Sequence, residues 1–139
     1  MKRILSILLI FVSLSAASGC SVPDDMQLDV YLGTTEDLKL LHVNASTQEK
    51  QLQIEKIHEA VTDIEAIDKP LDLFAFYPDY TIVVDDLEDE TAERITVVLD
   101  INRDRLELYR VQNGEISPTL YRSNMSVEEF KSYMNLVKN

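Results

Sequence analysis

The sequence has one cysteine, three glycines and few basic residues, and each shortage excludes a class of protein. A single cysteine excludes an intramolecular disulfide and any metal site built from two or four cysteines. Three scattered glycines cannot form a glycine-rich loop that cradles phosphate. The 13 basic residues against 25 acidic ones give a net charge of −12. This excess argues against nucleic acid or an anionic lipid surface as a partner held through charge.

Long hydrophobic runs are also missing, because the longest one covers only residues 4–14. As a helix, these residues would reach about half of a ~30 Å hydrocarbon core, so a permanent transmembrane helix is not expected. Lys2 and Arg3 precede the run, and the small residues 15–19 follow it. A basic start, a short apolar stretch and a small-residue tail are the three parts of a secretory signal peptide.

The only cysteine, Cys20, stands directly after this tail. Ala17-Ser18-Gly19-Cys20 resembles the lipobox of bacterial lipoproteins, although Ala17 stands where leucine is most frequent. The resemblance implies cleavage between Gly19 and Cys20, a diacylglyceryl group on the Cys20 thiol, and acyl chains such as palmitate. Two or three such chains, at about 0.8 kcal/mol per buried methylene, anchor a domain stably. The alternative is an ordinary secretory peptide with an incidental cysteine.

The organisation expected from these features has three parts: a lipoprotein signal peptide at 1–19, the lipidated cysteine with a short tether at 20–27, and a single domain at 28–139. The implied location is the cell membrane, lipid-anchored on its extracytoplasmic face. Loss of Lys2 and Arg3 leaves 25 acidic and 11 basic residues, so the remaining 120 residues carry a net charge of −14.

The domain pattern predicts α+β structure. Strands are expected at 28–32 and 38–43, although 38–43 would also suit a helical turn. Alternation of apolar and polar residues predicts further strands at 80–85, 95–101, 105–111 and 116–121. The short turn 102–104 and the Asn113-Gly114 pair connect them as hairpins. Pro118 predicts that the last strand lies at an edge.

Two helices are expected beside these strands. Ser46 and Glu49 form a capping box for a helix of about twenty residues, whose apolar stripe runs through Ile64 and Ile67 and ends before Pro70. Ser126 and Glu129 form a second capping box for a closing helix. We therefore expect an antiparallel sheet of about four to five strands, with two helices packed on one face and solvent on the other.

This order of elements resembles that of a broad group of small Gram-positive lipoproteins. They share a lipobox, an early strand, a helix, a meander and a final helix that begins Ser-x-Glu-Glu-aromatic, which here is residues 126–130. The resemblance is one of architecture across most of the mature chain. It implies no catalytic residue.

Chemical motifs are scarce. His42 and His58 are the only histidines, no His-Glu-x-x-His pair occurs, and no serine lies in Gly-x-Ser-x-Gly. We expect no enzyme activity and no cofactor other than the covalent lipid on Cys20.

The strongest local feature is a run of acidic residues between two expected strands. Its six carboxylates belong to Asp85, Asp86, Glu88, Asp89, Glu90 and Glu93. Such a run is typical of a solvated hairpin tip. It would also suit a cationic partner or, less specifically, Ca²⁺, although the Asp-x-Asp-x-Asp-Gly register is absent.

Arginine is the only basic residue type from 94 to 122, and it suits bidentate pairing with carboxylates. One outward column should form on the expected strand 105–111, made of Arg105, Glu107, Tyr109 and Val111. Together with the acidic run, this column is the predicted interaction surface. The alternative is a set of cross-strand ion pairs on a solvated face.

The resulting expectation is a membrane-anchored, non-enzymatic domain that binds a protein or peptide but not nucleic acid. One alternative is an immunity or exclusion lipoprotein that sequesters a cationic peptide. Another is a metal-dependent module.

Overall fold

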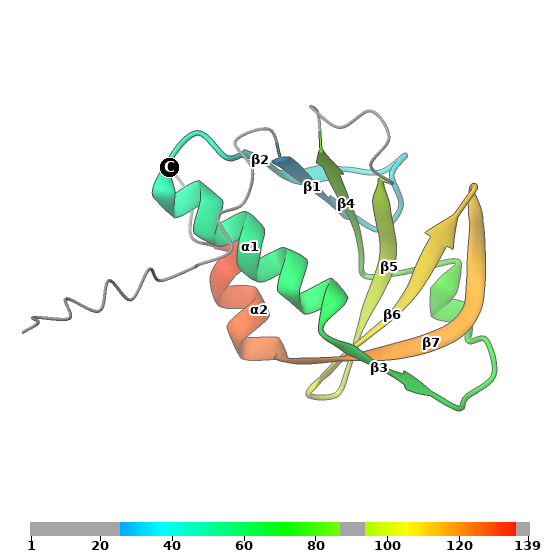
Figure 1. The fold of residues 1–139 in the computed structure, drawn as a ribbon. Helices are drawn as coiled ribbons and strands as arrows, with labels where there is room; N and C mark the ends of the chain where they lie inside the picture. Colours follow the sequence, from blue (N-terminus) through cyan, green and yellow to red (C-terminus); the bar gives the residue numbers. More distant parts are fainter. Residues whose placement is uncertain (1–25, 87–93, 136–139) are drawn as a thin grey trace, which may run out of the picture.

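The computed structural model describes residues 26–86 and 94–135, which form one antiparallel sheet with two helices on the same face (Figure 1). Seven strands contribute, in the spatial order β2-β1-β4-β5-β6-β7-β3. Their bounds are β1 Met26–Leu32, β2 Lys39–Asn44, β3 Ile64–Ile67, β4 Tyr80–Asp86, β5 Ile95–Asn102, β6 Arg105–Gln112 and β7 Glu115–Ser126. The α+β class is confirmed. The expected number of four to five strands is wrong.

The two helices are α1, Gln48–Thr62, and α2, Val127–Met134. Ser126 caps α2 as expected, since its hydroxyl oxygen accepts a hydrogen bond from the Glu129 amide at 3.1 Å. The cap of α1 is Thr47 rather than Ser46, and its hydroxyl oxygen accepts from the Lys50 amide at 3.3 Å.

The first helix is shorter than its apolar spacing predicts. It ends at Thr62, and Ile64–Ile67 forms strand β3 instead of a further helical turn. β3 pairs with β7, with Ile64 opposite Ser123 and Ile67 opposite Leu120. Beside the last helical residue, the Asn124 amide donates to the Asp63 carbonyl at 3.0 Å. Strand pairing with a distant segment therefore overrides the helical pattern, as β-branched isoleucines allow.

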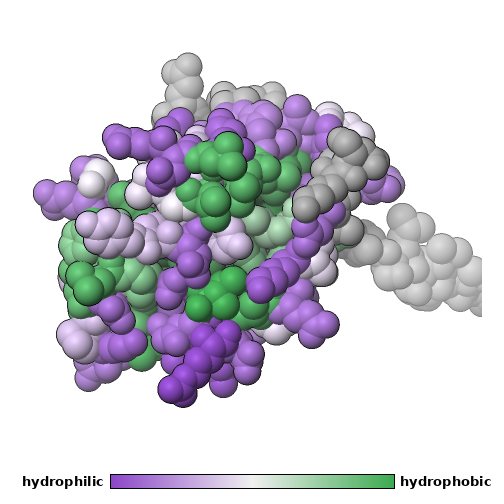
Figure 2. Space-filling view, turned by 180° about the vertical axis from the view of Figure 1, so that it is seen from behind, coloured by the Kyte–Doolittle hydropathy of each residue, from purple (hydrophilic) through white to green (hydrophobic). Residues whose placement is uncertain are grey.

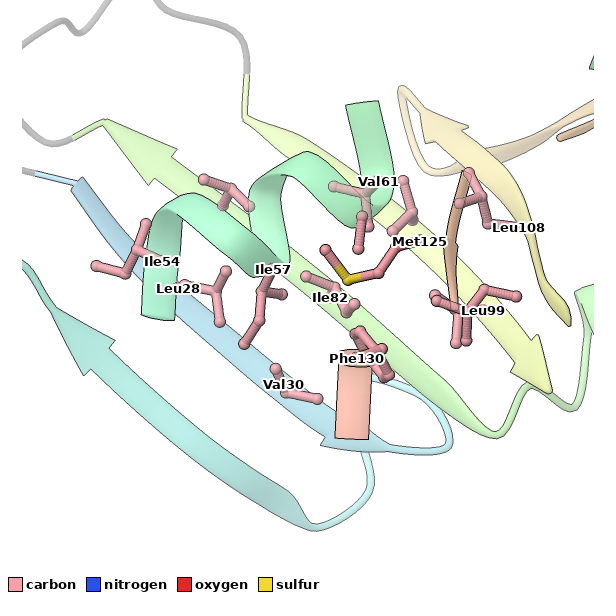
Figure 3. Close-up of a cluster of buried hydrophobic side chains, with 14 of the residues drawn as sticks. Leu28, Val30, Ile54, Ile57, Val61, Ile82, Leu99, Leu108, Met125 and Phe130 are labelled. Atoms are coloured by element: carbon pink, nitrogen blue, oxygen red, sulfur yellow. The ribbon is translucent and has the colours of Figure 1, made fainter. Parts of the chain in front are cut away.

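The main core lies between the helices and the sheet (Figure 3). Ile57 of α1 lies next to Leu28 of β1 and Ile82 of β4, and Phe130 of α2 is fully buried in the same cluster. The period-2 pattern correctly predicted the inner residues of β4, β5 and β6. Each large apolar side chain buried in this way contributes about 1.5–3 kcal/mol.

A second, smaller core covers part of the outer face, which is the face of the sheet opposite the helices. Residues 68–78 cross this face and contain the 3₁₀ turn η1, Leu73–Ala75. Ala75 packs there against Val98, Tyr109 and Leu120. The expectation of a fully solvated outer face is therefore wrong for this half of the sheet.

β7 is not an edge strand, because it pairs with both β6 and β3. Pro118 nevertheless avoids a conflict with the ladder. It precedes the four residues that pair with β3, and the pairing with β6 is irregular between Tyr109 and Val111, opposite this part of β7. A residue without an N–H group is tolerated at such a place.

Candidate functional site

The half of the outer face that residues 68–78 leave uncovered is the candidate site. Antiparallel pairing aligns one residue from each of five strands in a row across it. The row is His42 on β2, Asp29 on β1, Val83 on β4, Thr96 on β5 and Val111 on β6. It therefore runs from a charged end at β2 to an apolar end at β6.

A groove lies over this row, and we call it the outer groove. Its wider part is a hollow of about 590 Å³, lined among others by Asp29, Tyr31, Asp85 and Arg94. Its narrower part, of about 230 Å³, is lined by residues that include Phe76. The two parts share Thr35, Thr96 and Val111, so they are continuous. The groove thus offers a polar, charged compartment followed by an apolar one.

Two carboxylates lie at the charged end of the outer groove, and each is paired. Asp29 Oδ1 lies 2.6 Å from His42 Nδ1 and 3.4 Å from Lys39 Nζ. Asp85 Oδ1 accepts a hydrogen bond from Arg94 Nε at 2.6 Å, and this bond raises the pKa of Arg94. The Asp29 and Asp85 side chains are only 13% and 14% exposed. The Arg94 side chain is 66% exposed, so a cationic group of a partner could displace it from Asp85.

Exposed apolar side chains continue beyond the groove onto residues 68–78. Leu73, Phe76 and Tyr77 are all exposed, and Tyr77 is 82% exposed. Figure 2, which views the molecule from behind, shows apolar side chains in several patches separated by polar ones. A partner seated in the groove would therefore meet apolar surface at Phe76.

The predicted acidic surface is placed in part. Asp85 lines the outer groove, and Asp86 is the last residue of β4. Glu88, Asp89, Glu90 and Glu93 lie outside the described residues, as do Gly19 and Cys20. Arg94, which directly precedes β5, is again described and pairs with Asp85.

The predicted outward column on β6 is corrected. Arg105, Glu107 and Tyr109 do alternate with the inward Leu106 and Leu108, but only Arg105 is exposed. Tyr109 is fully buried under residues 68–78, with its ring centroid 5.0 Å from that of Phe74.

Glu107 is 3% exposed and is enclosed by polar partners. Its carboxylate accepts hydrogen bonds from Arg122 Nη2 at 3.2 Å and Asn102 Nδ2 at 3.3 Å. Lys69 Nζ lies 4.0 Å away. Period-2 alternation predicts which face of the sheet a side chain lies on, but it does not predict which segment covers that face. The burial of Glu107 and Tyr109 was therefore not predicted from the sequence.

Several groove residues were also missed, among them Asp29, Tyr31, Thr96 and Phe76. The signal available for Asp29 and Tyr31 was their alternation with Leu28, Val30 and Leu32, which puts them on one polar strand face. The order β2-β1-β4 then places that face beside Asp85, and no local pattern in the sequence reveals this order.

Other chemistry is sparse in the described part of the chain. Residues 26–86 and 94–135 contain no group of three or more His, Cys, Asp or Glu side chains able to hold a metal ion. In the same ranges no helix is long and apolar enough to cross a membrane. Burial lowers the pKa of His58 on α1.

Comparisons with known protein families, with curated proteins and with solved structures found no match to this chain.

Proposed function

We propose that the chain is a lipid-anchored, extracytoplasmic and non-enzymatic domain that binds a peptide segment in the outer groove. The observation that carries the proposal is the row from Asp29 to Val111 beneath the outer groove, in which Val83 is only 7% exposed and Val111 also packs against the second core. It belongs to the central strands of a sheet whose other face is closed by two helices. Ligand sites in general are concave, with apolar walls and a few polar groups that fix orientation.

The partner that suits this groove carries a basic residue next to an apolar or aromatic one. Asp29 and Asp85 at one end favour a cation, and Phe76 at the other end favours an apolar side chain. The acidic run that begins at Asp85 and the net charge of −12 would attract such a peptide over longer distances.

The binding test uses a synthetic peptide of alternating lysine and leucine, titrated into the full chain by calorimetry at low salt. Thr96→Arg places a long cationic side chain in the middle of the groove and should weaken binding at least tenfold. Ser132→Arg makes the same charge change on exposed α2 and should leave binding unchanged. Absence of binding to the unsubstituted chain, or equal loss in both variants, would overturn the proposal.

The anchor is tested separately by Cys20→Ala. If Cys20 carries the lipid, this variant should be released from the membrane fraction, because an unacylated domain has no comparable attachment. Retention of the variant at the membrane would contradict the anchor without affecting the groove.

An immunity or exclusion role is the more specific form of the same proposal. The acidic run that begins at Asp85 favours it, since sequestration of a cationic peptide needs many negative charges. Cells with and without the gene would be exposed to a cationic antimicrobial peptide. Better survival with the gene is expected, and equal survival would exclude this role.

A further inference from the structure

We propose that a second site, at the hairpin turn between β5 and β6, binds a phosphate group of a soluble ligand. A hollow of about 400 Å³ lies there, and we call it the arginine hollow. Its lining residues are Asn102, Arg103, Asp104, Arg105, Glu107 and Arg122. Three arginines and two acidic residues, Asp104 and Glu107, therefore line one small space in a chain whose net charge is −12.

Among the described residues, the carboxylates of the hollow form an ion pair with only one of the three arginines, Arg122. The buried Glu107 is hydrogen-bonded by Arg122 and Asn102, and Lys69 is within 4.0 Å of it. Within residues 26–86 and 94–135, neither Arg103 nor Arg105 forms an ion pair. Both are exposed, and both line the hollow. Their charge remains available to an added anion.

Arg122 has a further donor to offer. Its Nε atom is buried and forms no hydrogen bond within the described part of the chain. A buried donor without a partner is destabilising, and in native proteins it is normally satisfied by protein, water or ligand. The guanidinium group is planar and presents paired donors, the geometry that suits the oxygens of phosphate better than a lysine would.

The backbone of the turn gives an independent indication. Arg103 has φ = 59°, in the left-handed region that glycine and asparagine adopt at lower cost. The neighbouring hairpin turn places Asn113 and Gly114 in that region, as expected. Non-glycine residues held in this conformation cluster at functional sites. An arginine with this φ costs some stability, and its side chain lines the hollow.

The position of the hollow favours a soluble ligand over a lipid headgroup. Met26 pairs with Asp86, whereas Asn102 lies at the opposite end of the strands, beyond the pairing of Tyr80 with Leu99. The hollow and the start of β1 are thus at opposite ends of the sheet. If Cys20 is the membrane anchor proposed above, the anchored part of the chain enters the sheet at the end opposite the hollow.

Inorganic phosphate is the first probe, titrated into the full chain by calorimetry at low salt, with sodium chloride of equal ionic strength as the blank. We expect saturable binding that weakens with added salt. Arg103→Gly should weaken it at least fivefold while the melting temperature stays equal or rises, because glycine relieves the turn. Arg110→Gln is the control, because it also removes a charge from β6 but Arg110 does not line the hollow. The Arg110 guanidinium group instead lies 4.9 Å from the centroid of the Tyr121 ring. This variant should leave phosphate binding unchanged.

The second probe is a vesicle of phosphatidylglycerol. No vesicle binding is expected, since the chain as a whole is acidic. If the chain binds the vesicles and Arg103→Gly abolishes this binding, the ligand is a lipid headgroup and the proposal of a soluble ligand is wrong. Lack of phosphate binding, or equal weakening in Arg103→Gly and Arg110→Gln, would overturn the site itself. None of these results depends on the outer groove or on Cys20.

Discussion

The hydroxyl oxygen of Tyr109 accepts a hydrogen bond from the backbone amide of Asp72 at 3.1 Å, across 37 residues of sequence. The same hydroxyl group donates to the Pro70 carbonyl at 3.5 Å. One buried side chain on β6 thereby fixes the segment that covers half of the outer face. The extent of the outer groove depends on where this segment stops.

Tyr109→Phe should lower the free energy of unfolding by about 1–2 kcal/mol, because it leaves the Asp72 amide without its partner. Protection from hydrogen exchange should fall first in residues 70–76. Tyr77→Phe is the matched control in the same segment, since that ring is 82% exposed and should change stability very little. Equal effects of the two substitutions would contradict the role assigned to Tyr109.

Local pattern predicted much of this fold. Alternation in residues 80–85, 95–101 and 105–111 correctly gave three strands and their inward faces. Asn113 and Gly114 form the expected turn with positive φ at both residues. These features depend on interactions between residues close in sequence, so a short stretch of sequence is enough to predict them.

Most errors involve partners distant in sequence, whereas the cap of α1, at Thr47 rather than Ser46, is a local error. Ile64 and Ile67 continue a helical spacing, yet their strand pairs with residues 120–123 of β7. This partner is more than fifty residues away in sequence, so the local pattern does not indicate the pairing. Glu107 and Tyr109 are buried because residues 68–78 fold back over β6. Asp85 was predicted as a site residue, but its neighbours across β1 follow only from the strand order.

Gly33 and Gly114 allow a test of how closely the loop beside the groove is packed. Both have positive φ, so alanine at either position should cost about 1 kcal/mol from the backbone alone. At Gly114 an added Cβ meets nothing within 4 Å, whereas at Gly33 it would lie 2.6 Å from Asp37 Oδ2.

Gly33→Ala should therefore destabilise the chain clearly more than Gly114→Ala, as measured by urea unfolding. The reason is that Asp37 would have to give up its bonds to the Thr34 amide and hydroxyl, at 2.8 and 2.9 Å. If the two variants have the same free energy of unfolding, backbone strain alone accounts for the destabilisation in both.

Asp100 should make stability depend on pH. Burial, together with a hydrogen bond and repulsion from Asp79, raises the pKa of Asp100 to about 6, and Glu107 and Asp72 act in the same direction. Since this folded-state pKa exceeds the value of about 3.9 in an unfolded chain, the stabilisation from protonated Asp100 is complete below about pH 4. It is lost as the pH rises through about 6.

Asp100→Asn replaces the carboxyl group with a neutral isostere. The variant should melt at a higher temperature than the unsubstituted chain at pH 7.5, and the difference should shrink at pH 4. Thermal unfolding in buffers of equal ionic strength measures it. A difference that is the same at both pH values would mean that Asp100 does not titrate in this range.

The Asp85–Arg94 ion pair offers the sharpest test of the outer groove, because its two partners should have opposite effects on peptide binding. Arg94 covers the Asp85 carboxylate at 2.6 Å, and a cationic peptide must compete with it. Arg94→Gln should therefore strengthen binding of the lysine–leucine peptide several-fold, whereas Asp85→Asn should weaken it. Arg94 is 66% exposed but Asp85 is only 14% exposed, so urea unfolding of each variant is measured alongside to separate a change in binding from a loss of folding. If simple net charge governed binding, Lys131→Gln on α2 would strengthen it as much as Arg94→Gln does. That equality would place the peptide elsewhere on the acidic surface.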